Sequence, residues 1–199
     1  MRIPSRETCY RLMREMAMLE NIVRHSLQVS RVADWLVRQL AWKGRPLNRD
    51  LVEAAALLHD ITKTRSLTTG EKHSESGCDL LVDCGFAEVG DIIRQHVKLD
   101  TYFESDTPSE AEIVNYADKR VLHDRIVSLD ERMAYILKRY GSTPEYYARL
   151  RWLWEISNLQ EKRIFAVLPV SPDGMEAQME AIDLALELQK ILEPPEPDA

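Results

Sequence analysis

Apolar residues recur at helical spacing along almost the whole chain, and this periodicity restricts the fold more than any other feature. Val29, Val32 and Leu36 form one stripe of a helix predicted over residues 22–41, and a similar stripe runs through residues 6–20. No alternation of apolar and polar residues persists long enough to predict a strand. The pattern therefore predicts an all-α protein.

Capping residues mark where several of these helices begin. Asn48 is predicted to cap the helix in the segment RDLVEAAALLHD. In the segment TPSE, Thr107 is the expected N-cap, with Pro108 at the first helical position and Glu110 completing a capping box. The segments SLDE and STPE carry the same kind of signal. Each of them predicts the start of a further helix.

Breaks between the helices are indicated by polar residues and glycine. The polar stretch TKTRSLTTGEK predicts a loop. Two helices, separated at Gly85, are expected over residues 73–84 and 86–98. These boundaries place His73 and His96 near the ends of the two predicted helices.

The C-terminal part is expected to form an extension of the main domain. The helix that follows STPE is predicted to run to about residue 165, which gives a domain over residues 1–165. After the turn VLPVSPDG, Asp173 is expected to cap a last helix that ends near Leu192. The acidic, Pro-rich tail EPPEPDA is predicted to be disordered. Residues 166–199 are therefore predicted to contribute one helix and a tail.

The composition excludes several classes of protein. The chain has 26 basic and 33 acidic residues, and this net charge of -7 argues against a general nucleic-acid binder. Its three cysteines form no disulfide or CxxC pattern, which is typical of a reducing compartment. The N-terminus lacks the apolar core of a signal peptide, and no apolar run approaches the roughly 18 residues of a membrane span. We expect a cytoplasmic protein.

Six ionisable side chains share an unusual position, on the core-facing sides of separate predicted helices. A lone histidine on an apolar face is usually a core residue with one hydrogen bond, and Lys or Arg partners can neutralise a buried aspartate. Four buried histidines would still need partners, whereas a metal centre satisfies all six groups together. Imidazole and carboxylate ligands suit Mn, Fe, Co, Ni or Zn better than Ca. The six residues are His25, His59, Asp60, His73, His96 and Asp118.

The order and context of these residues resemble the HD-domain superfamily. His25, the doublet His59–Asp60 and Asp118 match its H…HD…D signature, within the local contexts RHSLQVSRVA, ALLHDITK and IVNYADK. His73 and His96 extend the match to the H…HD…H…H…D subset. The resemblance covers roughly residues 19–130. It implies an HD-domain helical bundle, here with a C-terminal helical extension, and most often the activity of an HDIG-type metal-dependent phosphohydrolase.

The resemblance also implies a role for each matching residue. His25, His59 and Asp118 would bind a first divalent transition-metal ion, His73 and His96 would bind a second, and Asp60 would bridge the two. A water or hydroxide between the ions would attack the phosphate, so Asp60 counts as a catalytic residue.

Two absences separate this chain from particular branches of the superfamily. The sequence has no GYP triplet and no double histidine at His96, both of which are expected in cyclic-di-GMP phosphodiesterases. With 199 residues it is also short for the large deoxynucleotide triphosphohydrolases.

Three basic residues are candidates for binding the substrate. Lys63 follows Asp60 by three residues; it is either a catalytic phosphate contact or a solvated lysine, and its HDxxK context resembles the functional case. Arg125 lies seven residues after Asp118, where it would either line the pocket or form a surface ion pair. Lys98, two residues after His96, is a weaker candidate.

The leading hypothesis is a metal-dependent phosphohydrolase that acts on a nucleotide or a phosphomonoester. The same six ligand types also suit a di-iron oxygenase, and the domain could instead be a metal-stabilised nucleotide-binding module. Dependence on oxygen separates the first two, and nucleotide binding without turnover would indicate the third. We expect a small phosphorylated partner and no membrane, and we leave a homo-oligomer open.

Overall fold

The computed structural model describes residues 1–193, which are mostly helical, and the prediction of an all-α fold is confirmed. One short antiparallel pair of strands, β1 and β2, joins α7 to α8 and was not predicted, because two-residue strands carry no alternating pattern. The elements are α1 (Arg6–Glu15), α2 (Glu20–Trp42), α3 (Arg49–Leu58), α4 (Lys63–Thr69), α5 (His73–Asp83), α6 (Ala87–Arg94), α7 (Glu110–Lys119), β1 (Val121–Leu122), β2 (Arg125–Ile126), α8 (Leu129–Tyr140), α9 (Pro144–Phe165), two 3₁₀ turns (Pro172–Gly174 and Glu176–Gln178) and α10 (Leu184–Leu192).

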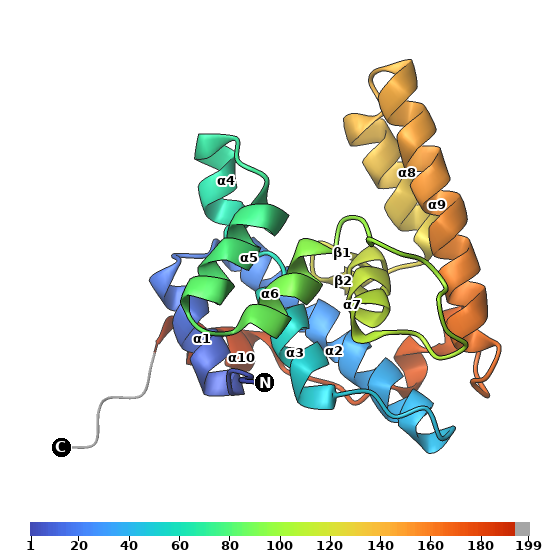
Figure 1. Ribbon diagram of the computed structural model, residues 1–199, viewed down its shortest axis with the longest axis horizontal. Coiled ribbons are helices and arrows are strands. Elements are labelled where there is room, and N and C mark those ends of the chain that lie inside the picture. The colour runs from blue at the N-terminus through green and yellow to red at the C-terminus, as the bar shows by residue number, and fades with distance from the viewer. Residues whose placement is uncertain (194–199) are drawn as a thin grey trace.

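Helix α2 is the centre of the bundle. It packs against α3, α7 and α10, and α3 also packs against α6 (Figure 1). The predicted stripe of Val29, Val32 and Leu36 is completely buried in this core. Helix α7 packs on α2, α3 and α6, and α5 packs on α6, so that residues at the ends of these helices come together.

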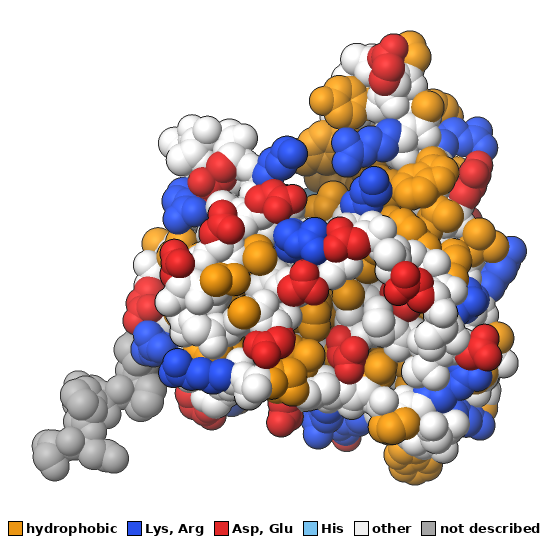
Figure 2. Space-filling model, in the orientation of Figure 1, with side chains coloured by type: hydrophobic (Ala, Val, Ile, Leu, Met, Phe, Trp, Pro, Cys, Tyr) orange, Lys and Arg blue, Asp and Glu red, His pale blue; other side chains and the backbone are white. Residues whose placement is uncertain are grey.

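Helices α8 and α9 form a paired arm that projects from the bundle (Figure 1). Hydrophobic side chains gather on the surface of this arm (Figure 2). Tyr140, Tyr146 and Trp152 of its two helices are exposed.

The base of the arm is held by Arg120, which follows α7. Its guanidinium donates to the Tyr116 hydroxyl at 2.7 Å and to Glu161 of α9 at 3.1 Å, as well as to two backbone carbonyls.

The C-terminal segment returns to the bundle. Helix α10 packs on α1 and α2, and Glu187 accepts hydrogen bonds from Tyr10 at 2.5 Å and from Arg6 at 3.3 Å. The tail predicted to be disordered, EPPEPDA, begins at Glu193, and its residues 194–199 lie outside the described part of the chain. Within residues 1–193, no helix combines the length and the apolar character that a membrane crossing requires.

Two predicted caps are confirmed, at Asn48 and Ser128, and the helix predicted to begin at STPE does begin there, with Thr143 as its cap. Asn48, Ser128 and Thr143 each accept a hydrogen bond from a backbone N–H in the first turn of α3, α8 and α9, respectively. Helix α9 also ends at Phe165, as expected.

Two other predicted helix starts are wrong. Helix α7 is capped by Ser109, not Thr107, because Ser109 and Glu112 exchange a complete pair of capping hydrogen bonds. Helix α10 is capped by Asp183, whereas Asp173 lies in a 3₁₀ turn. In both cases the segment offers more than one capping residue, and packing of the helix selects among them.

Two boundaries near the candidate site also differ from the prediction. The expected loop over residues 62–72 contains α4, which ends where Gly70 adopts a φ of 71°. Helix α6 ends at Arg94 and does not continue to residue 98. The amide of Asn115 instead binds the carbonyls of Gln95 and His96, at 3.0 and 2.9 Å, and so holds a turn there.

Candidate metal centre

The structure brings all six predicted ligand residues together. His25 comes from α2, His59 and Asp60 follow the end of α3, and Asp118 lies in the last turn of α7. His73 is the first residue of α5. His96 lies in the turn after α6, which the Asn115 amide holds in place.

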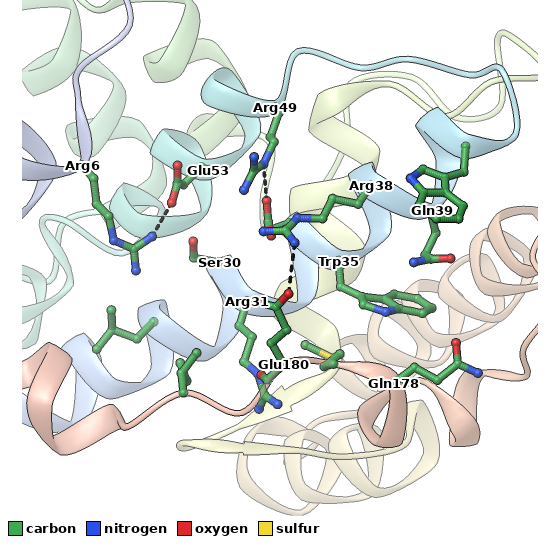
Figure 3. Close-up of a pocket in the computed structure, with 15 residues that line it drawn as sticks. Arg6, Ser30, Arg31, Trp35, Arg38, Gln39, Arg49, Glu53, Gln178 and Glu180 are labelled. Atoms are coloured by element: carbon green, nitrogen blue, oxygen red, sulfur yellow. Dashed lines mark hydrogen bonds and ion pairs between the residues drawn. The ribbon is translucent and has the colours of Figure 1, made fainter.

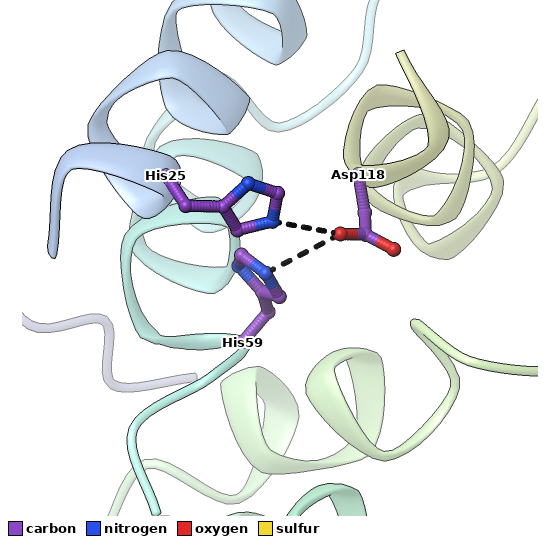
Figure 4. Close-up of side chains that lie close together, drawn as sticks. All are labelled: His25, His59 and Asp118. Carbon is purple, nitrogen blue, oxygen red and sulfur yellow. Dashed lines mark hydrogen bonds and ion pairs between the residues drawn. The ribbon is translucent and has the colours of Figure 1, made fainter. Parts of the chain in front are cut away.

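The first group consists of His25, His59 and Asp118 (Figure 4). Nε2 of His25 lies 3.0 Å from Oδ1 of Asp118, and Nε2 of His59 lies 3.7 Å from the same oxygen. One ligand atom from each of the three residues lies within 4.8 Å of the others, as an ion site requires.

The second group surrounds Asp60. Its Oδ1 lies 3.2 Å from Nε2 of His73 and 3.7 Å from Nε2 of His96, and its Oδ2 lies 3.3 Å from Nε2 of His59. Asp60 therefore contacts histidines of both groups.

Backbone carbonyls fix the orientation of three imidazole rings. The Nδ1 atoms of His25, His59 and His96 lie 2.9, 2.8 and 2.6 Å from the carbonyl oxygens of His123, Ala56 and Ile93. Such bonds require a proton on Nδ1, so in the neutral form of each ring Nε2 faces the cluster with its lone pair. The turn that supplies the His123 carbonyl is strained, with a φ of 58° at a non-glycine residue.

Two buried atoms in the middle of the cluster test whether these residues fit a metal. Nε2 of His59 and Oδ1 of Asp60 are completely buried, and neither has a hydrogen-bond partner among the described residues. Buried polar atoms are normally paired, so these two call for a further group between them. Imidazole nitrogens and carboxylate oxygens at this spacing fit a divalent transition metal.

The charges of the cluster also suit metal binding. Burial by itself would raise the pKa of the Asp60 carboxyl, but His59 and Lys63 together hold that pKa well below its usual range. Burial likewise opposes ionisation of Asp118, yet the hydrogen bond with His25 and the charge of Arg132 hold its pKa well below its usual range. Burial lowers the pKa of His96 to about 3. Ionised carboxylates and a neutral imidazole are the forms that bind metals.

Lys63, a predicted substrate contact, is the first residue of α4 and lies at the cluster. Its Nζ donates to Oδ2 of Asp60 at 2.7 Å. The side chain of Lys63 is 37% exposed and that of His73 is 25% exposed, whereas that of Asp60 is only 1% exposed. The cluster is therefore open to solvent on the side of Lys63 and His73.

The other two predicted substrate contacts are placed differently. Lys98 lines a cavity of about 570 Å³ together with His73, and its ammonium lies 6.0 Å from the centre of the Trp152 ring. Arg125 lies on β2 with an exposed side chain, and it pairs with Glu131 at 3.3 Å. Among the described residues, the structure thus shows a surface ion pair for Arg125 and no contact with the six cluster residues.

The sequence reasoning missed Arg132, which reaches the cluster from the arm. Its Nη2 lies 3.9 Å from Oδ1 of Asp118, and its side chain is 15% exposed. No spacing relates α8 to the metal-ligand pattern, so the sequence carries no signal for this contact. Asn115 was also missed as a supporting residue, although it precedes Asp118 by three positions on the same helix face.

A second cavity, of about 430 Å³, lies between α2 and the segment before α10 (Figure 3). Its arginines are mostly engaged by acidic neighbours: Arg6 pairs with Glu53, and Arg38 and Arg49 both pair with Asp34. None of the six cluster residues lines it.

Comparison with known proteins agrees with this architecture. Residues 22–121 match the model of the HD domain, and the chain belongs to the HD-domain family. It is 30% identical over 154 residues to an uncharacterized protein of Methanocaldococcus jannaschii, and the match covers 70% of this chain and 90% of that protein. A solved structure described as a predicted HD superfamily hydrolase, from an uncultured Thermotogales bacterium, is 22% identical with a TM-score of 0.46, over 83% of this chain and 94% of that one.

Proposed function

We propose that this protein is a metal-dependent phosphohydrolase that cleaves the phosphate ester of a nucleotide or a phosphomonoester. The observation that carries the proposal is the pair of buried, unpartnered atoms, His59 Nε2 and Asp60 Oδ1, at the centre of six convergent nitrogen and oxygen donors. Membership of the HD-domain family supports the same assignment.

Under this proposal the two groups hold two divalent ions. His25, His59 and Asp118 would hold one ion, His73 and His96 would hold the other, and Asp60 would contact both. Bound divalent metals lower the pKa of water and stabilise negative charge on an attacked phosphate.

The chain's own residues prepare the site for this chemistry. The backbone carbonyls keep a proton on Nδ1 of His25, His59 and His96, so that each neutral ring presents Nε2 to a metal without a change of tautomer. Lys63 holds Oδ2 of Asp60 and leaves Oδ1 free. An ammonium has three N–H donors, so Lys63 can also donate to a phosphate that enters from the exposed side.

The test is phosphate release from a panel of nucleotides and phosphomonoesters. Metal-stripped protein is loaded separately with Mn, Fe, Co, Ni or Zn and assayed in air and under argon. We expect oxygen-independent release with at least one metal. Product formation that requires oxygen would instead indicate a di-iron oxygenase, and tight nucleotide binding without turnover would indicate a binding module.

A matched pair of variants ties the activity to the cluster. Asp60→Ala is expected to lose bound metal and phosphate release together, because it removes the carboxylate that both groups share. Asp79→Ala, which removes an exposed aspartate of α5, is expected to keep both. Full activity of Asp60→Ala would contradict the proposal.

A further inference from the structure

Arg132 is a largely buried cation whose guanidinium makes no hydrogen bond to another of the described residues. Its side chain is 15% exposed, and its Nε is completely buried without an acceptor among residues 1–193. The carboxylate oxygen that it approaches, Oδ1 of Asp118, is 3.9 Å away, which is beyond hydrogen-bond distance. A buried N–H of a guanidinium that has no acceptor is costly, and the Nε of Arg132 is such a group.

Arg120 shows what a structural arginine looks like in the same protein. It is more deeply buried than Arg132, and its guanidinium donates to Val127 O at 2.7 Å, to the Tyr116 hydroxyl at 2.7 Å and to Pro172 O at 3.1 Å, in addition to its ion pair with Glu161. Arg132 makes no comparable set of bonds within the described residues. Holding the arm in place therefore does not account for Arg132.

Balancing the charge of Asp118 does not account for Arg132 either, once a metal is considered. A metal ion held by Asp118 would take over the charge that Arg132 now faces at 3.9 Å. Lys63 keeps its own acceptor in Asp60, at 2.7 Å. In the metal-loaded site Arg132 would thus be left without an anion of its own.

We propose that Arg132 binds the non-bridging oxygens of the substrate's phosphate group, opposite Lys63, and that the α8–α9 arm thereby forms one wall of the active site. This inference rests on the proposed function. A planar guanidinium fits two phosphate oxygens at once, and its geometry is more specific than that of a lysine ammonium. Arg132 contributes no metal ligand and no proton; it positions and neutralises the phosphate.

The experiment compares Arg132→Gln and Arg132→Lys in the metal-loaded protein. Arg139→Gln is the control, because Arg139 is an exposed arginine of the same helix. The readouts are kcat and KM for the substrate found in the panel, the Kd of inorganic phosphate by calorimetry, the metal content and the unfolding midpoint. Phosphate binding is measured without turnover and so does not depend on finding a substrate.

We expect Arg132→Gln to raise the Kd of phosphate and KM about 10- to 100-fold, with metal content unchanged. Arg132→Lys should recover part of this loss, because it keeps the charge and lacks the planar fork, and it serves in place of Arg132→Gln if the latter does not fold. Unchanged phosphate affinity in both variants would overturn the role of Arg132. So would a loss confined to metal content or stability.

The two proposals fail in different ways. Phosphate release by the wild type combined with unaltered phosphate affinity in the Arg132 variants would reject the role of Arg132 and leave the proposed function standing. Arg132-dependent phosphate binding in a protein that hydrolyses no ester would support the anion contact and reject the hydrolase.

Discussion

The Nε2 atoms of His73 and His96 lie 3.1 Å apart, although the two residues are separated by 23 positions in the chain. His96 directs its Nδ1 at the carbonyl of Ile93, so its Nε2 presents a lone pair to His73. Oδ1 of Asp60, 3.2 Å from His73, faces the same space. Acceptor atoms at this spacing repel one another unless a cation or a proton lies between them.

This arrangement predicts the metal stoichiometry of two variants. His96→Gln and His73→Gln are each expected to bind one ion where the wild type binds two, because the group of His25, His59 and Asp118 stays intact. Elemental analysis after equilibration with metal measures the number. Glu88→Gln is the control, since Glu88 is an exposed residue of α6 outside both groups. Two ions in both test variants would contradict a site at His73 and His96.

The amide of Asn115 supports His96 indirectly, and its removal should weaken metal binding. Asn115 donates to the carbonyls of Gln95 and His96 and accepts from the Lys119 ammonium at 2.6 Å. We expect Asn115→Ala to raise the Kd of the metal about 10- to 100-fold, as the loss of other outer-shell partners does. Metal titration by calorimetry tests this. Asn158→Ala, which removes an amide bonded only within α9, should bind metal normally.

Arg120 is predicted to be essential for stability. Arg120→Met removes the guanidinium from the Glu161 carboxylate, which then keeps only the Tyr116 hydroxyl as a donor, and it leaves the buried Val127 carbonyl without its side-chain donor. We expect the free energy of unfolding to fall by about 3 kcal/mol. Arg120→Lys should recover little, because an ammonium cannot reach the same acceptors. Denaturant unfolding measures the change. The control is Arg151→Lys. Arg151 forms an exposed ion pair with Glu155 on α9, so this change should alter the free energy of unfolding by less than about 0.5 kcal/mol.

Glu187 should make stability depend on acidic pH. Burial raises the pKa of its carboxyl, but Lys190, Tyr10 and Arg6 together lower it below the ordinary value. The resulting stabilisation is present above the carboxyl's unfolded pKa, about 4.3, and is lost as the pH falls through the lower folded pKa. At pH 7 we expect Glu187→Gln to be less stable than the wild type by roughly 1 kcal/mol.

Unfolding measurements at two pH values test whether the charge of Glu187 stabilises the fold. Denaturant unfolding at pH 7 and near pH 3 should show the difference between wild type and Glu187→Gln shrinking at the lower pH. Glu176→Gln, at an exposed glutamate, should show no such trend. A difference of the same size at both pH values would mean that the charge of Glu187 does not hold α10 in place.

Local spacing was sufficient to predict the helical class, the buried stripe of α2, the caps at Asn48 and Ser128 and the helix that begins at STPE. It also indicated that six ionisable residues face the core, because residues three and four apart share a face of a helix. Their role as metal ligands stays a prediction. Spacing shows on which face of its own helix a residue lies. It relates residues within a few turns of one helix and does not show which other helix packs on that face.

Tertiary structure decided what lies opposite each face. Helix α6 stops at Arg94 because Asn115, on another helix, binds the carbonyls of the following turn. Arg132 reaches Asp118 because the hairpin after α7 turns the chain back and Arg120 holds the arm against the bundle. No periodic pattern in the sequence predicts either contact, because each joins elements whose relative position depends on packing of the whole core. The sequence by itself therefore determined the helices and the inward-facing histidines and aspartates, and only the folded chain decided which cation faces them.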